Sequence, residues 1–292
     1  MIVILAPTAQ LASDTLSLSN PPVLTVEAEY GGFVVEGTAY TAAHHQPIGS
    51  PYVGRHVSPF GRPAPCNDSK IPTLKEDDVA LISHIDIDTL GGLMRATDSF
   101  EENGVFWFYA EHIDTNGLHK AKRDHPCWVL YNGILAWIEE NYPEIDKTRN
   151  NDVSDFCYRA FDFIRETLAD GTLATRMGNA YLYLQDKLDE SSFVEERPSG
   201  LIIRRSKGER VNHLYRGAKA IISYNESRKN ITISTADPIP NLSCRRLAQE
   251  WWGDRAGGHN QIAGSARGKI MSEEQFNEAI TKFEDILIRS QA

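Results

Sequence analysis

Three side chains that bind metal ions follow one apolar run of the sequence at alternate positions. They are His84, Asp86 and Asp88, and they come directly after the run 78–83. Residues two apart on an extended segment point the same way, so the three groups face one direction where a strand ends. Imidazole with carboxylates suits Mn²⁺, Mg²⁺ or Zn²⁺, or a pair of such ions. Asp88 alone has an ordinary alternative role as a helix cap, but the trio is costly at this place unless something binds it.

A second cluster, His112 and Asp114, has the same one-residue gap. It follows the apolar run 105–110, which predicts a second buried strand. In open α/β sheets, ligands bind at the carboxyl ends of the strands. We therefore expect both clusters to join in one metal site, where two ions about 3.5–4 Å apart would hold an activated water. Asp88 is expected to be catalytic as well as a metal ligand.

Two adjacent histidines, His44 and His45, come at the end of another predicted strand, 32–41. His44 is predicted as a further metal ligand. His45 is predicted as a general acid near the leaving group. A pair of exposed histidines without a function is the alternative. The Pro- and Gly-rich loop that follows, residues 46–69, is of a length that is often functional in compact domains.

A glycine-rich segment near the end of the chain is a candidate anion site. Gly257, Gly258 and His259 come first, and Arg267 follows within ten residues. Glycines let backbone N–H groups approach an anion closely, and the histidine and arginine supply matching charge. These four residues are predicted to bind the substrate.

The elements around these residues predict an α/β fold with two lobes. The first lobe is expected to contain a hairpin (23–29 with 32–41, separated by Gly31-Gly32), strands 78–84 and 105–110, and helices from 88, at 127–141, 152–170 and 173–190. The second lobe is expected to contain strands 201–204, 218–224 and 230–234, a helix from Asn241 to Trp252, and a last helix opened by the capping box Ser272–Gln275. The polar stretch 189–200 lies between the lobes.

Bulk composition excludes some functions. The formal net charge of −10 and the pI of about 5.4 argue against general duplex DNA binding. The N-terminus lacks a basic region and a signal-length apolar run, and no stretch reaches the length of a membrane span. We therefore expect a cytoplasmic protein without a membrane partner, and a homodimer is compatible with the sequence. The four cysteines form no metal-binding pair and are expected to be reduced core thiols.

Two segments resemble the DHH family of phosphoesterases. Residues 230–288, with the loop Ala256–His259 and then Ala263-Gly264, resemble that family's C-terminal substrate-binding domain, whose Gly-Gly-Gly-His loop and Ala-Ala-Gly segment grip the substrate phosphate. Residues 83–92 resemble its first motif, a histidine and two aspartates before a Gly-Ser pair, although one residue separates His84 from Asp86 where the family usually has three. The family's Asp-His-His triplet is not found in the chain.

The resemblance implies a domain plan and a reaction. Residues 1–190 would be the catalytic metal-binding domain, with residues 1–75 an unusual β-rich part, and residues 200–292 would be the substrate-binding domain. The implied activity is Mn²⁺-dependent hydrolysis of a small phosphorylated substrate, a nucleotide or a short oligonucleotide. Two alternatives remain open: a zinc hydrolase of an ester or amide, and a protein that binds a nucleotide or other anion without catalysis.

Overall fold

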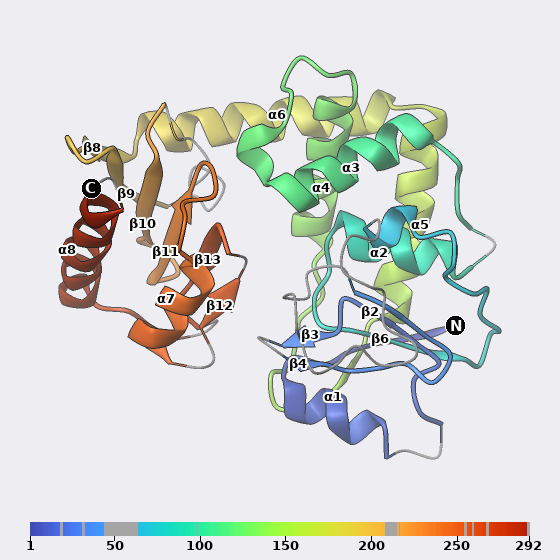
Figure 1. Cartoon of the computed structure of the whole chain (residues 1–292). Helices are drawn as coiled ribbons and strands as arrows, with labels where there is room; N and C mark the ends of the chain where they lie inside the picture. The colour runs from blue at the N-terminus through green and yellow to red at the C-terminus, as the bar shows by residue number, and fades with distance from the viewer. Residues whose placement is uncertain are drawn as a thin grey trace. The chain divides into compact units, whose positions relative to one another are not determined.

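The described part of the chain forms two compact units, Met1–Tyr181 and Leu182–Ala292 (Figure 1). The computed structural model describes all residues except 18–19, 31–32, 44–63, 98, 208–214, 216, 254–255, 259, 267–268 and 291–292. Each unit contains a sheet and helices, so the prediction of an α/β fold with two lobes is confirmed. The division between the units falls inside helix α6 (Thr172–Glu190).

A five-stranded sheet forms the centre of the first unit, in the order β5-β2-β6-β1-β7. Its strands are β1 (Ile2–Leu5), β2 (Leu24–Val26), β5 (Tyr40–Ala42), β6 (Val79–Ile82) and β7 (Asn151–Asp152). The first four are parallel, and β7 is an antiparallel edge strand. Val26 lies beside Ile82, so the residues that follow β2 and β6 leave the sheet side by side.

Helices complete the first unit. They are α1 (Ala9–Thr15), α2 (Ile87–Arg95), α3 (Gly104–Asn116), α4 (Cys127–Asn141), α5 (Ser154–Ala169) and the first part of α6. Short 3₁₀ turns, η1 (Pro65–Asn67) and η2 (Leu118–Lys120), flank α2 and α3. Helix α1 lies on the other side of the sheet from α2 (Figure 1). The helices predicted at 127–141, 152–170 and 173–190 are confirmed to within two residues.

Two strand predictions in this unit were wrong. Residues 105–110 belong to helix α3, in which Phe106, Trp107, Tyr109, Ala110 and Ile113 are buried while Val105 and Phe108 are exposed. That spacing is helical, but an unbroken apolar run alone does not distinguish a buried strand from a buried helix. The predicted long hairpin is also absent: β2 and β5 pair in parallel. Within the described parts of 23–41, the short strands β3 (Glu29–Tyr30) and β4 (Phe33–Val34) form an antiparallel pair.

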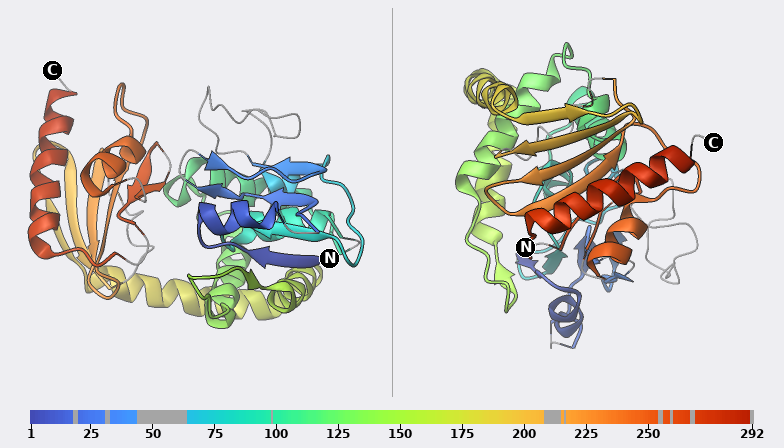
Figure 2. Two further views of the ribbon diagram at one scale, coloured as in Figure 1. Left: turned by 90° about the horizontal axis from the view of Figure 1, so that it is seen from below. Right: turned by 90° about the vertical axis from the view of Figure 1, so that its left-hand side faces the viewer.

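The second unit has a six-stranded sheet in the order β12-β13-β11-β10-β9-β8. Its strands are β8 (Phe193–Glu196), β9 (Leu201–Ser206), β10 (Ala220–Asn225), β11 (Asn230–Thr235), β12 (Gly257–Gly258) and β13 (Ile262–Gly264). Helices α7 (Cys244–Trp252) and α8 (Glu273–Arg289) share an apolar core with this sheet. The right-hand view of Figure 2 shows α8 lying across one face of the strands.

The predictions for the second unit are largely confirmed. The three strands are present, and the capping box formed by Ser272 and Gln275 opens α8. Helix α7 begins at Cys244, later than expected, because Asn241 has a φ of 63° and Ser243 is the residue that caps the helix. The four cysteines are free and buried, as expected for core thiols. None of the described helices has the length and apolar composition needed to cross a membrane.

Helices α4 and α6 approach each other at two glycines. A Cβ at Gly133 would lie 2.0 Å from the carbonyl oxygen of Ala174, and a Cβ at Gly178 would lie 2.1 Å from that of Val129. Real Cβ atoms do not come so close to backbone atoms, so the two helix backbones touch only because both positions are glycine. Nearby, the Tyr181 hydroxyl donates to Glu139 at 2.9 Å. The start of α6 is thereby fixed to the first unit.

Gly178→Ala should destabilise the first unit, because the added methyl must push two helix backbones apart. An overpacked contact of this kind costs about 1–3 kcal/mol, which exceeds the roughly 0.5–1 kcal/mol that alanine gains over glycine in a helix. Urea unfolding followed by circular dichroism measures the effect. Gly104→Ala is the matched control, because its Cβ would meet only Phe108 ring atoms at 3.9 Å or more. Equal stability of the two variants would contradict the close approach.

Candidate metal centre

The residues that follow β2 and β6 build a cluster of metal-binding side chains. Glu27 comes directly after β2, and His84 follows β6 after one residue. Asp86 is the N-cap of α2, where its Oδ1 accepts the backbone N–H of Thr89 at 2.8 Å. Asp88 lies in the first turn of the same helix. The parallel register of the two strands brings these groups to one edge of the sheet.

One group of three ligands consists of Glu27, His84 and Asp86, whose ligand atoms all lie within 4.8 Å of one another. The Nε2 atom of His84 is 2.9 Å from Oδ2 of Asp86 and 3.2 Å from Oε2 of Glu27. Glu27 is 1% exposed, whereas the side chains of His84 and Asp86 are 28% and 34% exposed. His84 and Asp86 are therefore partly accessible to solvent, whereas Glu27 is not.

A second group consists of Glu27, Asp88 and Asp114, again with ligand atoms within 4.8 Å of one another. Asp88 is buried, and its Oδ1 accepts the backbone N–H of Cys66 at 2.9 Å. Asp114 comes from helix α3. Glu27 belongs to both groups, so its carboxylate is the only one placed to be shared by two ions among the described residues.

The electrostatics of the cluster favour positive charge. Burial by itself lowers the pKa of His84, but the charges and hydrogen bonds of Asp86 and Glu27 outweigh it and raise that pKa well above its ordinary value. Burial, together with the negative charges of Asp88, Glu111 and Asp114, raises the pKa of the Cys66 thiol. Four carboxylates and one imidazole thus create a local field that a cation would relieve.

Glu27 is a candidate ligand that the sequence analysis did not predict. It follows the apolar run 23–26, as His84 follows its own strand, and that parallel is the signal that could have found it. Its φ is 48°, a left-handed conformation that is uncommon for residues other than glycine. Its N–H donates to the carbonyl of Ala42 at 2.8 Å, and the Thr89 hydroxyl donates to its Oε2 at 3.2 Å. Strained backbone of this kind is concentrated at functional sites.

The 3₁₀ turn η1 packs tightly over the cluster. Glu111 accepts the N–H of Ala64 at 3.1 Å and the Asn67 amide at 2.7 Å, and Arg95 donates to the carbonyl of Cys66 at 2.6 Å. A Cβ at Gly91 would lie 2.4 Å from Cβ of Cys66. Gly91 therefore permits η1 to lie against α2, where the N–H of Cys66 reaches Asp88.

The predicted metal ligands fall into three classes. His84, Asp86, Asp88 and Asp114 are brought together. His112 is not: its Nε2 lies 3.1 Å from the carbonyl oxygen of Lys120, and it belongs to neither group. The expected pairing of His112 with Asp114 assumed a strand, but residues two apart on a helix are about 200° apart around its axis. His44 and the predicted general acid His45 lie outside the described residues.

The predicted anion loop is partly described. Gly257 and Gly258 form β12, which pairs with β13. Gly258 has a φ of 143°, and a Cβ there would lie 2.4 Å from the carbonyl oxygen of Ile262. A Cβ at Gly257 would meet no described atom within 4 Å. His259 and Arg267 lie outside the described residues.

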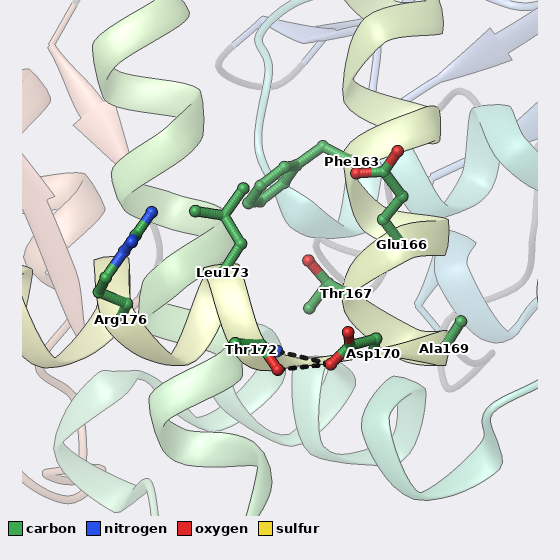
Figure 3. A pocket seen from close by; sticks show the side chains of 8 residues that line it. All are labelled: Phe163, Glu166, Thr167, Ala169, Asp170, Thr172, Leu173 and Arg176. Atoms are coloured by element: carbon green, nitrogen blue, oxygen red, sulfur yellow. Dashed lines mark hydrogen bonds between the residues drawn. The ribbon is translucent and has the colours of Figure 1, made fainter.

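A separate hollow of about 450 Å³ lies where α5 meets α6 (Figure 3). Phe163, Leu173, Glu166 and Arg176 are among its lining residues. At its rim the Thr172 hydroxyl and N–H both donate to Asp170. It contains none of the metal-binding side chains, so it is not part of the cluster.

Charge is distributed unequally between the two units. The first unit has 13 Lys and Arg residues against 25 Asp and Glu residues, a net charge of −12. The second has 17 against 15, a net charge of +2. The summed charge of the first unit therefore attracts cations and repels anions more strongly than that of the second.

Comparisons with known proteins give structural similarities, among them the following two. No family model and no curated protein matches the chain. Its structure is similar to that of PggH, a pGpG-specific phosphodiesterase from Vibrio cholerae, with a TM-score of 0.41 and 13% identity over 80% of this chain and 91% of that one. An uncharacterized protein from Helicobacter pylori G27 gives a TM-score of 0.21 and 11% identity over 72% and 76% of the two chains. Neither similarity is close enough to decide the chemistry, which depends on the residues of the cluster.

Proposed function

We propose that this chain is a metal-dependent phosphoesterase that acts on a nucleotide or short oligonucleotide. The observation that carries the metal dependence is the pair of ligand groups that share Glu27 at the ends of β2 and β6. The choice of phosphoester chemistry rests on the resemblance of residues 83–92 and 230–288 to DHH-family motifs. The metal dependence and the substrate class are therefore supported by different features of the chain.

The donor set fits divalent cations that prefer oxygen. Among the described residues it offers four carboxylates and one imidazole, and no thiolate. Such a set favours Mn²⁺ or Mg²⁺, because zinc sites are typically built from histidine and cysteine. Glu27, His84 and Asp86 would hold one ion, and Glu27, Asp88 and Asp114 a second. His44 remains a proposed additional ligand.

The chain's own residues would orient the reaction. A bound divalent cation supplies a Lewis acid and a water of lowered pKa. Asp88 is held in place by the Cys66 N–H, and Asp86 by the Thr89 N–H, so both carboxylates are fixed before any ion binds. The partly exposed side chains of His84 and Asp86 would face the incoming substrate. His45 is proposed as the general acid for the leaving group.

The substrate phosphate is proposed to bind the glycine loop of the second unit. A Cβ at Gly257 would meet no described atom, which leaves room beside this residue for an anion, and His259 and Arg267 are proposed to add charge. The net charge of +2 on this unit suits that role. The carboxylate-rich cluster disfavours the alternative of a zinc esterase or amidase. A measurement of turnover distinguishes the proposed enzyme from the other alternative, a protein that only binds anions.

Glu27→Gln should reduce turnover by at least about 100-fold, because it removes the ligand shared by both ion sites. Asp88→Asn should have a similar effect. Hydrolysis of bis(p-nitrophenyl) phosphate and of a dinucleotide with Mn²⁺ measures the rate, p-nitrophenyl acetate tests the esterase alternative, and calorimetry with Mn²⁺ measures binding. Glu76→Gln is the matched control, since it removes the same charge from an exposed position in the first unit.

Full metal-dependent activity of Asp88→Asn would disprove the proposed site. Hydrolysis of the acetate ester alone would favour the esterase. Tight nucleotide binding without metal or turnover would favour the anion-binding protein.

Gly257→Ala should weaken substrate binding without unfolding the protein. Its methyl would enter the open space that the phosphate is proposed to use, so KM for the dinucleotide should rise with little change in Tm. Gly258→Ala should instead lower Tm, because its φ of 143° and the Ile262 carbonyl exclude a side chain. Thermal unfolding and steady-state kinetics of the two variants separate these effects. An unchanged KM for Gly257→Ala would show that the phosphate does not approach this backbone.

A further inference from the structure

Ser83 is the single residue between β6 and His84, and its hydroxyl contacts two of the candidate ligands. Its Oγ donates to the backbone carbonyl of Glu27 and lies 2.9 Å from Nδ1 of His84. The same carbonyl also accepts the N–H of Glu29 at 2.7 Å. Ser83 therefore touches the main chain of one ligand and the ring of another.

The proton positions around Ser83 follow from what each atom can do. A carbonyl oxygen only accepts, so the one hydroxyl proton of Ser83 is directed at Glu27. The oxygen then presents lone pairs to His84, and Nδ1 must carry the hydrogen that lies between them. When Nδ1 of a neutral imidazole is protonated, the lone pair is on Nε2. Nε2 is the nitrogen that faces Asp86 and Glu27.

We propose that Ser83 is a positioning residue that selects the tautomer of His84 whose Nε2 binds the divalent cation. The inference rests on the proposed metal-dependent function. The hydroxyl also steadies the left-handed main chain of Glu27, so one side chain aligns two ligands from neighbouring strands. Metal-binding histidines generally donate their second N–H to a carboxylate, carbonyl or water oxygen, and here the Ser83 hydroxyl takes that place. Loss of such an acceptor typically costs 10–100-fold in metal affinity or activity.

Three variants test the role of the hydroxyl. Ser83→Ala should weaken Mn²⁺ binding by roughly 10–100-fold in calorimetric titrations. Ser83→Thr keeps the hydroxyl and should restore most of the affinity. Thr25→Val is the matched control: Thr25 is buried on β2, and its Oγ1 has no hydrogen-bond partner among the described residues. Its removal should leave the affinity unchanged.

The tautomer is read directly by nuclear magnetic resonance. In the wild-type protein loaded with diamagnetic Zn²⁺, ¹H–¹⁵N correlations of the histidine rings should show His84 protonated at Nδ1 and metal-bound at Nε2. The His84→Asn variant assigns its signals. This measurement needs no Ser83 variant, so it decides the question even if Ser83→Ala fails to fold by circular dichroism.

The outcomes separate this inference from the proposed function. Metal bound at Nδ1 of His84, or equal Mn²⁺ affinity of Ser83→Ala and Thr25→Val, would overturn the role of Ser83 while leaving a metal site intact. Failure of the wild-type protein to bind either Mn²⁺ or Zn²⁺ would overturn the proposed function, and the role of Ser83 with it.

Discussion

The parallel pairing of β2 with β6 is the constraint on which the cluster depends. Because Val26 lies beside Ile82, the next residues of the two strands, Glu27 and Ser83, leave the sheet as neighbours. A slip of one residue would turn either side chain to the other face of the sheet. The hydrogen bond from Ser83 to the Glu27 carbonyl and the left-handed φ of Glu27 both arise at this point. The left-handed backbone of Glu27 thus depends on the β2–β6 register, which burial of the sheet determines.

The close packing of α2 against the turn η1 adds two carboxylates to the residues that this register brings together. The helix is buried along nearly its whole length, and its first turn supplies Asp86 and Asp88. Gly91 lets the turn η1 lie against it, so that the Cys66 N–H reaches Asp88. Backbone donors fix carboxylates that would otherwise repel one another, but they do not neutralise them. The preorganised negative charge is what makes a bound cation favourable.

The sequence predicted the parts of this site that local pattern determines. His84, Asp86 and Asp88 follow an apolar strand. That pattern lies within one short segment, so recognising it does not require knowing how the rest of the chain folds. Glu27 was missed because its role depends on the pairing of two strands more than 50 residues apart. His112 was included because an apolar run was interpreted as a strand, and the helical period of α3 turns it away from Asp114. Long-range register and the choice between strand and helix are decided by tertiary packing, which composition does not contain.

The unequal charges of the two units bear on how such an enzyme would act. A phosphate approaching the first unit meets a net charge of −12, and the carboxylates of the cluster are among its sources. Two divalent cations would reverse the local field while the distant surface stays acidic. Metal loading would therefore be needed for the anion to approach the ligands as well as for the chemical step. The glycine loop of the second unit, whose net charge is +2, would bind the same phosphate without that requirement. Binding by the loop and access to the metal site would thus be separable properties of the chain.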